Sequence, residues 1–226
     1  MTVSDSQLSW LNELRSGDLC IDGGAHEGNI TDCLIAHQLR VIAVEPQSNC
    51  VAILRRRFQG RTAVAIEPCA LSETDGCAVL YECDSNTELT TTSRLYLEKS
   101  VFAISGSYKW PRMQIVNAIT LDSLIRKYGP PRLIKLDIEG SESVALKGLS
   151  IPVERIVFEF GSSLPSVMQD ATELITSLGS YRFNFCTGDF LGDGELFFDR
   201  WVDSACVLNA IGRVGCEWGS IFARFG

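Results

Sequence analysis

Short apolar runs alternate with stretches of helical periodicity along most of this chain. Runs of strand length are followed by segments whose apolar residues recur every three or four positions, as they do in amphipathic helices. The predicted strands are residues 18–22, 40–45, 62–68, 132–137, 155–160 and 182–186. The predicted helices are residues 29–37, 46–58, 121–128, a segment that ends at 149, and 165–179. This alternation predicts an α/β fold with a doubly wound, mainly parallel sheet that binds ligands at the carboxyl ends of its strands.

Several segments fall outside this alternation. Residues 1–17 carry leucines at helical spacing and are expected to form an N-terminal helical segment. Residues 78–81 follow a turn signal at 74–76 and are expected to return as an antiparallel arm, and residues 113–119 alternate like an extended arm. Residues 84–110 are rich in Ser and Thr with weak periodicity, and we interpret this irregular stretch as a lid loop over a bound ligand. A plain surface loop fits the same pattern. The last third predicts an acidic hairpin over 189–199, a helix over 202–211 and a closing strand over 220–225.

Length and composition narrow the class of protein. A chain of 226 residues suffices for one large α/β domain, and we expect a single domain over 1–226. The net charge of −8 disfavours nucleic acid and anionic membranes as partners, because both bind positive surfaces. Nine scattered cysteines without a C-x-x-C pair indicate core residues in a reducing compartment. With no apparent signal peptide or membrane-length apolar stretch, we expect a cytoplasmic protein; its oligomeric state is not predicted.

The first candidate site is the glycine-rich turn after the first predicted strand. Asp22 ends that strand, and Gly23, Gly24 and Gly28 follow without the G-x-G-x-x-G spacing of a pyrophosphate cradle. A cofactor with a charged amino-acid tail therefore fits better than a dinucleotide. Glu45 ends the second strand, 23 positions after Asp22, where a carboxylate can accept hydrogen bonds from both ribose hydroxyls. The alternative for each acid is a capping carboxylate, which for Glu45 would precede Pro46.

A second candidate site is an acidic cluster after the fourth predicted strand. Asp137 ends that strand with Glu139 and Glu142 beside it, and Glu159 ends the neighbouring strand. Carboxylates this close repel one another, and Lys135, a metal ion or a cationic ligand would relieve the repulsion. The spacing matches no standard calcium or zinc motif, so we expect no resident metal. Glu142 also fits a first-turn helix acid, and Glu159 a hydrogen-bonded strand-end acid.

Six sequence blocks, in this order, resemble the pattern of the FkbM-type S-adenosylmethionine-dependent methyltransferases. The similarity covers residues 18–160. The blocks are Asp22-x-Gly24-Ala25-x-x-Gly28-x-x-Thr31, Val44-Glu45-Pro46, Ala70-Leu71-Ser72, Thr120-Leu121-Asp122-x-Leu124, Ile134-Lys135-Leu136-Asp137-Ile138-Glu139-Gly140-x-Glu142-x-x-x-Leu146-x-Gly148 and Glu159-Phe160. The resemblance implies a class I methyltransferase (Rossmann-like) sheet with an antiparallel closing strand. It also implies S-adenosylmethionine as cofactor and a small hydroxylated acceptor, such as a sugar or polyketide.

The resemblance also implies roles for individual residues. A loop under the methionine part of the cofactor would be formed by Asp22, Gly23, Gly24, Ala25, His26 and Gly28, with Thr31 at the helix start. Glu45 and Pro46 would lie at the ribose, and Ala70, Leu71 and Ser72 near the adenine. Asp137 would face the methionine and the acceptor, and is the first candidate for a catalytic carboxylate, followed by Glu139 and Glu159. Gly23 and His26 depart from the family, which more often has an aliphatic residue and an asparagine there.

Other functions fit parts of this pattern. An N-methyltransferase acting on an amine or a protein remains open, although no N/D-P-P-Y/F-type run follows the fourth strand. A non-catalytic domain that binds S-adenosylmethionine is another alternative, made less attractive by the intact Asp22, Glu45 and Asp137. A dehydrogenase is disfavoured by the missing G-x-G-x-x-G and by the lack of a Tyr-x-x-x-Lys pair.

Overall fold

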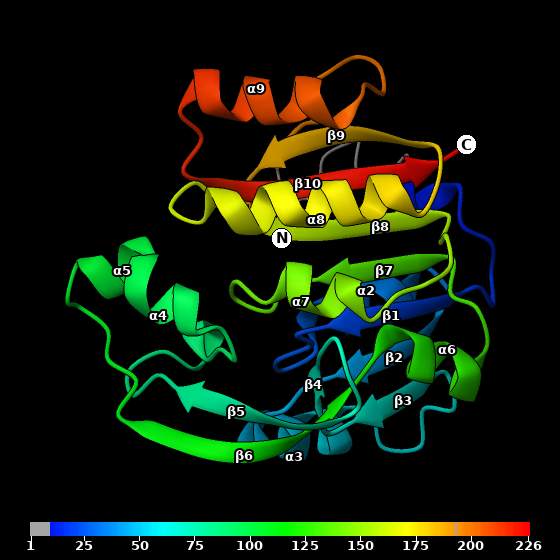
Figure 1. The fold of residues 1–226 in the computed structure, drawn as a ribbon. Coiled ribbons are helices and arrows are strands. Elements are labelled where there is room, and N and C mark those ends of the chain that lie inside the picture. The colour runs from blue at the N-terminus through cyan, green and yellow to red at the C-terminus, as the bar shows by residue number, and fades with distance from the viewer. Residues whose placement is uncertain (1–9, 193) are drawn as a thin grey trace.

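The central feature is a seven-stranded sheet with the order β3-β2-β1-β7-β8-β10-β9. The computed structural model describes residues 10–192 and 194–226. The strands are β1 (Leu19–Gly23), β2 (Arg40–Val44), β3 (Val64–Glu67), β7 (Leu133–Leu136), β8 (Arg155–Gly161), β9 (Tyr181–Thr187) and β10 (Trp218–Phe225). Parallel pairing joins β3, β2, β1, β7 and β8, whereas β10 runs antiparallel between β8 and β9 (Figure 1). The predicted mainly parallel sheet with an antiparallel closing strand is confirmed.

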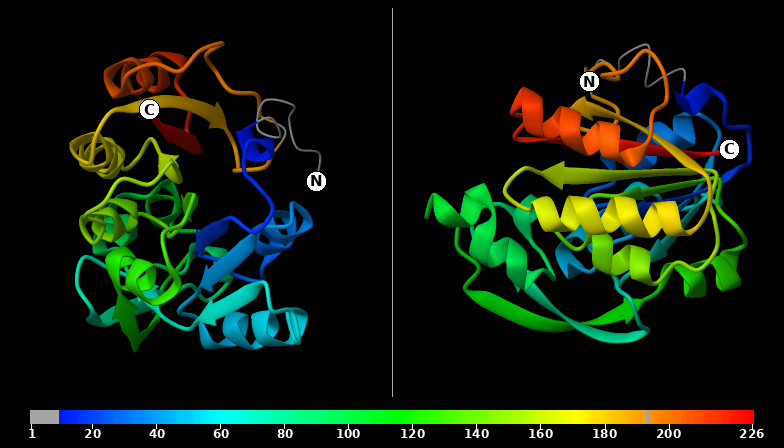
Figure 2. Two further views of the ribbon diagram at one scale, coloured as in Figure 1. Left: turned by 90° about the vertical axis from the view of Figure 1, so that its right-hand side faces the viewer. Right: turned by 45° about the horizontal axis from the view of Figure 1, so that its top comes forward.

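Helices cover both faces of this sheet. The main helices are α2 (Asn29–Ala36), α3 (Ser48–Arg57), α6 (Leu121–Tyr128), α7 (Glu142–Lys147), α8 (Pro165–Ser177) and α9 (Ser204–Val214). Figure 2 shows α6, α7, α8 and α9 on one face, and α2 and α3 on the other. Apolar residues of the first group and of the sheet form the largest core cluster, which includes Leu124, Leu146 and Ile175. The doubly wound arrangement follows from these two buried faces.

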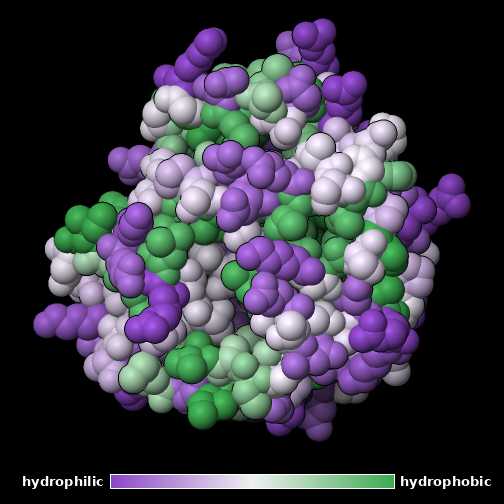
Figure 3. All heavy atoms as spheres, viewed as in Figure 1, coloured by the Kyte–Doolittle hydropathy of each residue, from purple (hydrophilic) through white to green (hydrophobic). Residues whose placement is uncertain are grey.

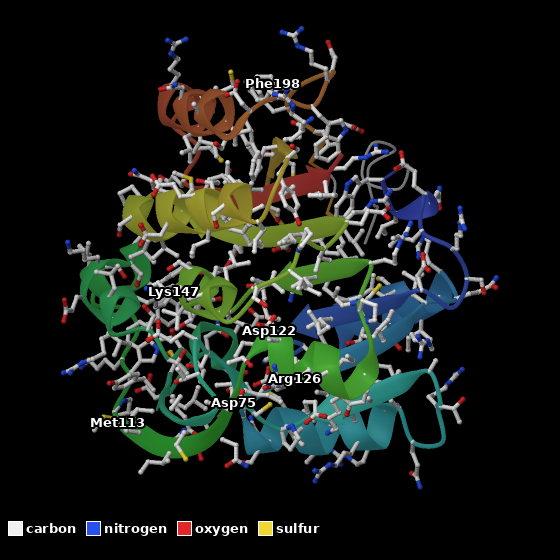
Figure 4. All side chains as sticks on the ribbon, turned by 45° about the vertical axis from the view of Figure 1, so that its right-hand side comes forward. Asp75, Met113, Asp122, Arg126, Lys147 and Phe198 are labelled. Carbon is white, nitrogen blue, oxygen red and sulfur yellow. The ribbon has the colours of Figure 1, made fainter. Side chains whose placement is uncertain are left out.

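Local signals in the sequence explain where several helices begin. The Thr120 side chain accepts a hydrogen bond from Ser123 N at the start of α6, and Pro165 occupies the first turn of α8. Asp75 adds a second cap, because its Oδ1 accepts from Thr120 N at 2.7 Å. Figure 4 shows Asp75, Asp122 and Arg126 gathered around this end of α6. These contacts fix α6 against the turn that contains Asp75.

A smaller sheet extends the molecule below the main one. It has the order β4-β6-β5, with β4 (Ala70–Leu71) parallel and β5 (Gly76–Glu82) antiparallel to β6 (Arg112–Ile119). Residues 78–81 and 113–119 are thus extended, as predicted, and they pair with each other across the 84–110 segment. Figure 3 shows apolar side chains at the surface over this hairpin and over the helix α5 (Val101–Ile104). Ile104 is 72% and Ile115 is 77% exposed.

Residues 84–110 are more ordered than the sequence predicts. They form the 3-10 helix η1 (Thr87–Leu89) and the short helices α4 (Arg94–Lys99) and α5. Asn86 caps η1, Ser93 caps α4 and Ser100 caps α5, each through a side-chain oxygen that accepts a backbone hydrogen bond. The polar residues that made this stretch look irregular are therefore the caps of its helices.

The prediction of a solvated hairpin over 189–199 is wrong. Among these residues, 189–192 and 194–199 contain no strand. Phe190 and Leu191 are buried, and the Asn184 side chain of β9 bonds to both the N–H and the C=O of Phe198. The segment is thus held against β9 by its aromatic residues, by Asn184 and by the hydrogen bond from Phe197 N to Phe185 O, without forming a strand among the described residues.

Two further expectations concern the ends of the chain and membranes. The predicted N-terminal helical segment over 1–17 lies partly outside the described residues, of which 10–12 are helical. Trp10 packs edge-on against Phe190 and Phe222. Among the described helices, none has the length and apolar character needed to cross a bilayer.

The close approach of Gly24 to β7 generates a stability prediction. Gly24 has a φ of +74°, and a Cβ there would lie 1.8 Å from Asp137 O. We expect Gly24→Ala to lower the free energy of unfolding by at least about 3 kcal/mol, because neither backbone can move freely. Gly17→Ala is the control, since Gly17 has a φ of +86° with no atom near its Cβ position, and it should cost about 1 kcal/mol. Equal losses in urea unfolding would contradict the close contact.

Candidate functional site

A cavity of about 750 Å³ opens at the carboxyl ends of β1, β2, β7 and β8. Its size is typical of a pocket for a small ligand, for which about 300–1,000 Å³ is usual. The segment with α4 and α5 lies beside these strand ends (Figure 1) and forms the opposite wall. The predicted location of ligands at this edge of the sheet agrees with the position of the cavity.

Lys135 organises the floor of this cavity. It lies in β7 in register with Asp22 of β1, so that the two side chains leave the sheet on the same face. Its Nζ is 3.3 Å from Asp22 Oδ1 and 3.4 Å from Asp137 Oδ2, and donates to the carbonyls of Gly23 and Gly24. Burial alone would lower the pKa of Lys135, but the Asp137 and Asp22 carboxylates outweigh it and raise that pKa. The lysine is thus a buried cation held by both predicted sites.

Asp22 lies below the cavity rather than on its wall. Its side chain is fully buried, and its Oδ2 accepts a hydrogen bond of 2.6 Å from Thr31 Oγ1. Gly28 is also part of the support, because a Cβ there would meet the side chains of Leu54 and Phe58 in and after α3. Asp22, Gly23, Gly28 and Thr31 therefore shape the loop from beneath, whereas Gly24, Ala25 and His26 line the cavity.

Glu45 lies on the cavity wall at the end of β2 and organises two loops. Its Oε2 accepts from His26 N and its Oε1 from Gln47 N, each at 2.9 Å. Burial raises the pKa of Glu45, although these two backbone hydrogen bonds counteract it. Because a carboxylate oxygen can accept more than one hydrogen bond, each oxygen keeps a lone pair for a ligand. Glu45 can therefore cap these backbone N–H groups and bind a ligand at the same time.

The third predicted block is split by the structure. Ala70 and Leu71 form β4 and line the cavity together with Pro46 and Cys69. Ser72 is not among the lining residues, and its N–H donates to Ile119 O of β6. It thus serves the smaller sheet rather than the cavity wall.

The acids after β7 converge with Glu159 of β8. One carboxylate oxygen from each of Asp137, Glu139 and Glu159 lies within 4.8 Å of the other two. Burial, followed by the charge of Asp137, raises the pKa of Glu139 well above its usual range, and burial with Asp137 and Glu139 does the same for Glu159. The sequence prediction that these acids repel one another is consistent with this geometry.

Glu142 has a different environment from these three acids. It begins α7, is 2% exposed, and its Oε1 accepts from the backbone of Ile138 and Gly140. Burial raises the pKa of Glu142 to about 7 despite these hydrogen bonds. Its bonds to the preceding turn agree with the predicted role of a first-turn helix acid.

The wall formed by 84–110 is attached to both sides of the cavity. On one side, His26 Nε2 lies 2.9 Å from Thr87 Oγ1, and Gln47 Nε2 donates to Thr87 O. On the other, Thr91 Oγ1 donates to Glu139 O at 2.6 Å, and Thr92 Oγ1 pairs with Ser141 Oγ. Hydrogen bonds to the loops after β1, β2 and β7 thus hold this wall over the strand ends.

Several lining residues were missed by the sequence analysis. Tyr96 of α4 is 5% exposed, and its hydroxyl makes no hydrogen bond of ordinary geometry to a described residue. Asp189 and Glu217 reach the cavity from the C-terminal third. The helix that carries Tyr96 is too short to show helical periodicity in the sequence. Asp189 and Glu217 become neighbours of the other acids only when the sheet folds.

The order and spacing of these site residues agree with a known family. The model of the methyltransferase FkbM domain matches residues 22–185. The chain belongs to the FkbM methyltransferase family. The matched range begins at Asp22 and includes Glu45, Asp137 and Glu159.

Solved structures resemble this FkbM domain at low sequence identity. An O-methyltransferase from Bacillus cereus in complex with SAH has 15% identity and a TM-score of 0.47, with 99% of this chain and 82% of that chain covered. An rRNA methylase from Streptococcus thermophilus has 12% identity and a TM-score of 0.46, with 96% and 92% covered. No curated protein matches the sequence. The class I methyltransferase fold of this domain therefore rests on its sheet and on the family match.

The structure gives reasons for the two departures from the FkbM pattern. A Cβ at Gly23 would lie 2.7 Å from Leu71 Cδ1, so that Leu71 fills the space of the usual aliphatic side chain. His26 adopts a φ of +47°, and its side chain reaches Thr87 in the opposite wall. These departures accompany contacts with β4 and with the 84–110 segment.

The buried lysine of this FkbM domain generates a second stability prediction. We expect Lys135→Met to lower the free energy of unfolding by about 3–5 kcal/mol, because Asp22 would stay buried without its cation. Lys127→Met is the matched control, since Lys127 pairs with Glu67 but its side chain is 55% exposed, and it should cost less than about 1 kcal/mol. Adding Asp22→Asn to Lys135→Met should restore part of the loss. Similar urea-unfolding results for both lysine variants would contradict the assigned role.

Proposed function

We propose that this protein transfers a methyl group from S-adenosylmethionine to a hydroxyl of a small metabolite or sugar. The observation that carries the proposal is the placement of Glu45, after β2, and Asp137, after β7, on the lining of one cavity, in a chain of the FkbM methyltransferase family. The strands β2 and β7 that precede them both pair with β1, which lies between them. This is the edge at which α/β sheets bind nucleotide-like ligands.

The residues present fit such a cofactor. The cavity wall near β2 combines the Glu45 carboxylate with the apolar Val44, Ala70 and Leu71, which suits a ribose joined to a flat base. Gly24 and Ala25 bring backbone rather than bulky side chains to the cavity above Lys135. We therefore assign Glu45 to the ribose and the Gly24–Ala25 turn to the amino-acid part.

The chemistry assigned to the chain is binding, orientation and movement of one proton. When bound, S-adenosylmethionine supplies a methyl group on a cationic sulfur; its transfer forms a C–O bond while the C–S electron pair stays on sulfur. Asp137 is placed to orient the acceptor hydroxyl and to accept its proton, because its carboxylate is partly exposed at the cavity while Lys135 holds it. The attached 84–110 wall limits access of water to this point.

Cofactor binding tests the proposal directly. By calorimetry, we expect S-adenosylmethionine or its demethylated product to bind with a Kd on the order of 1 μM, and NAD not to bind. Glu45→Gln should raise this Kd by about tenfold, because it replaces the negatively charged carboxylate that accepts hydrogen bonds from hydroxyl groups with a neutral amide. The control Glu73→Gln alters an exposed acid paired with Lys147 and should leave the Kd unchanged. Saturable NAD binding without any response to S-adenosylmethionine would refute the proposal.

The assignment of Asp137 is tested by turnover. Product mass after incubation with a panel of hydroxylated metabolites identifies an acceptor, and that acceptor is then used for kinetics. At saturating cofactor, we expect Asp137→Asn to lower kcat by about 10²-fold, since an amide cannot take the hydroxyl proton. An unchanged kcat would remove Asp137 as the base while leaving the methyl transfer intact.

A further inference from the structure

The cavity is lined by far more acidic than basic side chains. Nine of its described lining residues are Asp or Glu, and Lys135 is the one Lys or Arg among them. This lysine is already surrounded by Asp22, Asp137 and two carbonyls. Among the described residues, no cation forms an ion pair with Glu139 or Glu159. Of the lining acids, Asp137, Glu139 and Glu159 bring their carboxylate oxygens together in one cluster.

These three carboxylates are held by the backbone of fixed elements. Asp137 directly follows β7, and its N–H donates to Gly23 O. Glu139 lies in the next turn, where its C=O accepts from Thr91 Oγ1. Glu159 lies within β8, opposite Ser220 of β10. Their convergence to within 4.8 Å is thus a property of the folded sheet and its adjoining turn.

An unpartnered polar group points to a ligand at the same place. The Tyr96 side chain is 5% exposed and lines the cavity, and its hydroxyl is left without a hydrogen bond among the described residues. Its hydroxyl interacts most strongly with the Glu139 carboxylate, although without the geometry of a full hydrogen bond, and then with Glu159 and Glu142. A buried hydroxyl without a partner is costly, and a bound water or ligand oxygen at the acids would satisfy it.

We propose that Asp137, Glu139 and Glu159 bind a hard divalent cation, such as Mg²⁺, Mn²⁺ or Ca²⁺, at the acceptor end of the cavity. Ligands on opposite sides of a Ca²⁺ ion are about 4.6–5.2 Å apart, so oxygens within 4.8 Å can share one ion. In the part of the chain that the structure describes, neither the Glu139 nor the Glu159 carboxylate has a paired cation. A divalent ion supplies two positive charges to balance them, whereas an organic ammonium supplies one. Tyr96 donates to a water or acceptor oxygen on the ion.

The role of the ion in the reaction rests on the methyl transfer proposed above, but its binding does not. A hydroxyl coordinated through an oxygen lone pair loses its proton more easily, as water does on a metal ion. The proton passes to a carboxylate oxygen of Asp137 that is not used as a ligand. The oxygen then keeps the electron pair of its O–H bond for the new C–O bond.

Mn²⁺ titration of the full chain tests the site without turnover. Followed by electron paramagnetic resonance, we expect one Mn²⁺ per chain with a Kd on the order of 10⁻⁴ M, displaced by Mg²⁺ or Ca²⁺. Glu159→Gln and Glu139→Gln should each raise this Kd at least tenfold, and Tyr96→Phe should raise it less. Glu217→Gln is the matched control, because Glu217 lines the same cavity outside the three acids, and its Kd should stay within twofold. Thermal melting of each variant verifies that it is folded.

The outcomes separate this inference from the proposed function. Calorimetry with S-adenosylmethionine on the same samples tests the latter, so cofactor binding without Mn²⁺ binding overturns the metal site alone. Absence of saturable Mn²⁺ binding, or an unchanged Kd in both Glu→Gln variants, overturns it. Binding of glucosamine that depends on Glu159, with no Mn²⁺ binding, also overturns it and assigns the acids to an ammonium group. With the acceptor identified, loss of turnover in EDTA and recovery with Mg²⁺ would support the catalytic role.

Discussion

The buried ion pair between Lys135 and Asp22 is the constraint on which the rest of the site depends. A lysine in a fully buried strand is costly unless anions and carbonyls surround it. Here the partners come from β1, from the glycine turn after it and from Asp137 after β7. The ion pairs and hydrogen bonds of the Lys135 ammonium therefore fix the two loops that form the cavity floor. The same contact explains why Gly24 must lie against the backbone of Asp137.

The upper wall depends on a different kind of interaction. Segment 84–110 has few strand pairings, and it is attached by side-chain hydrogen bonds at Thr87, Thr91 and Thr92. Trp110 Nε1 donates to Leu89 O, and its ring packs edge-on against Tyr96. Hydrogen bonds of this kind contribute only about 1 kcal/mol each, so this wall is less strongly held than the sheet. A rigid floor with a more weakly attached cover suits a cavity that must admit its ligands.

The sequence predicted the parts of the site that local pattern controls. Glu45 and Asp137 end apolar strands, and the parallel sheet places both at one edge whatever the details of packing. The sequence did not predict that Asp22 lies under the cavity. That position depends on the register of Asp22 with Lys135, which lie in two strands far apart in the chain. Lysine within an apolar strand was a usable signal for that pair. Tyr96 and Glu217 offered no comparable signal, since their positions depend on the tertiary arrangement of short or variable segments.

The acidic lining of the cavity also bears on which acceptors suit the proposed reaction. A phosphate or carboxylate at the acceptor would face Asp137, Glu139 and Glu159 at close range, with Lys135 already engaged by two carboxylates. In a desolvated site this repulsion is larger than at a surface, where water and salt screen it. A bound divalent ion would offset part of that charge, yet Glu88, Asp189 and Glu217 would still line the approach. For the proposed methyl transfer, we therefore expect neutral polyols and amines to be better acceptors than phosphorylated sugars or nucleic acids.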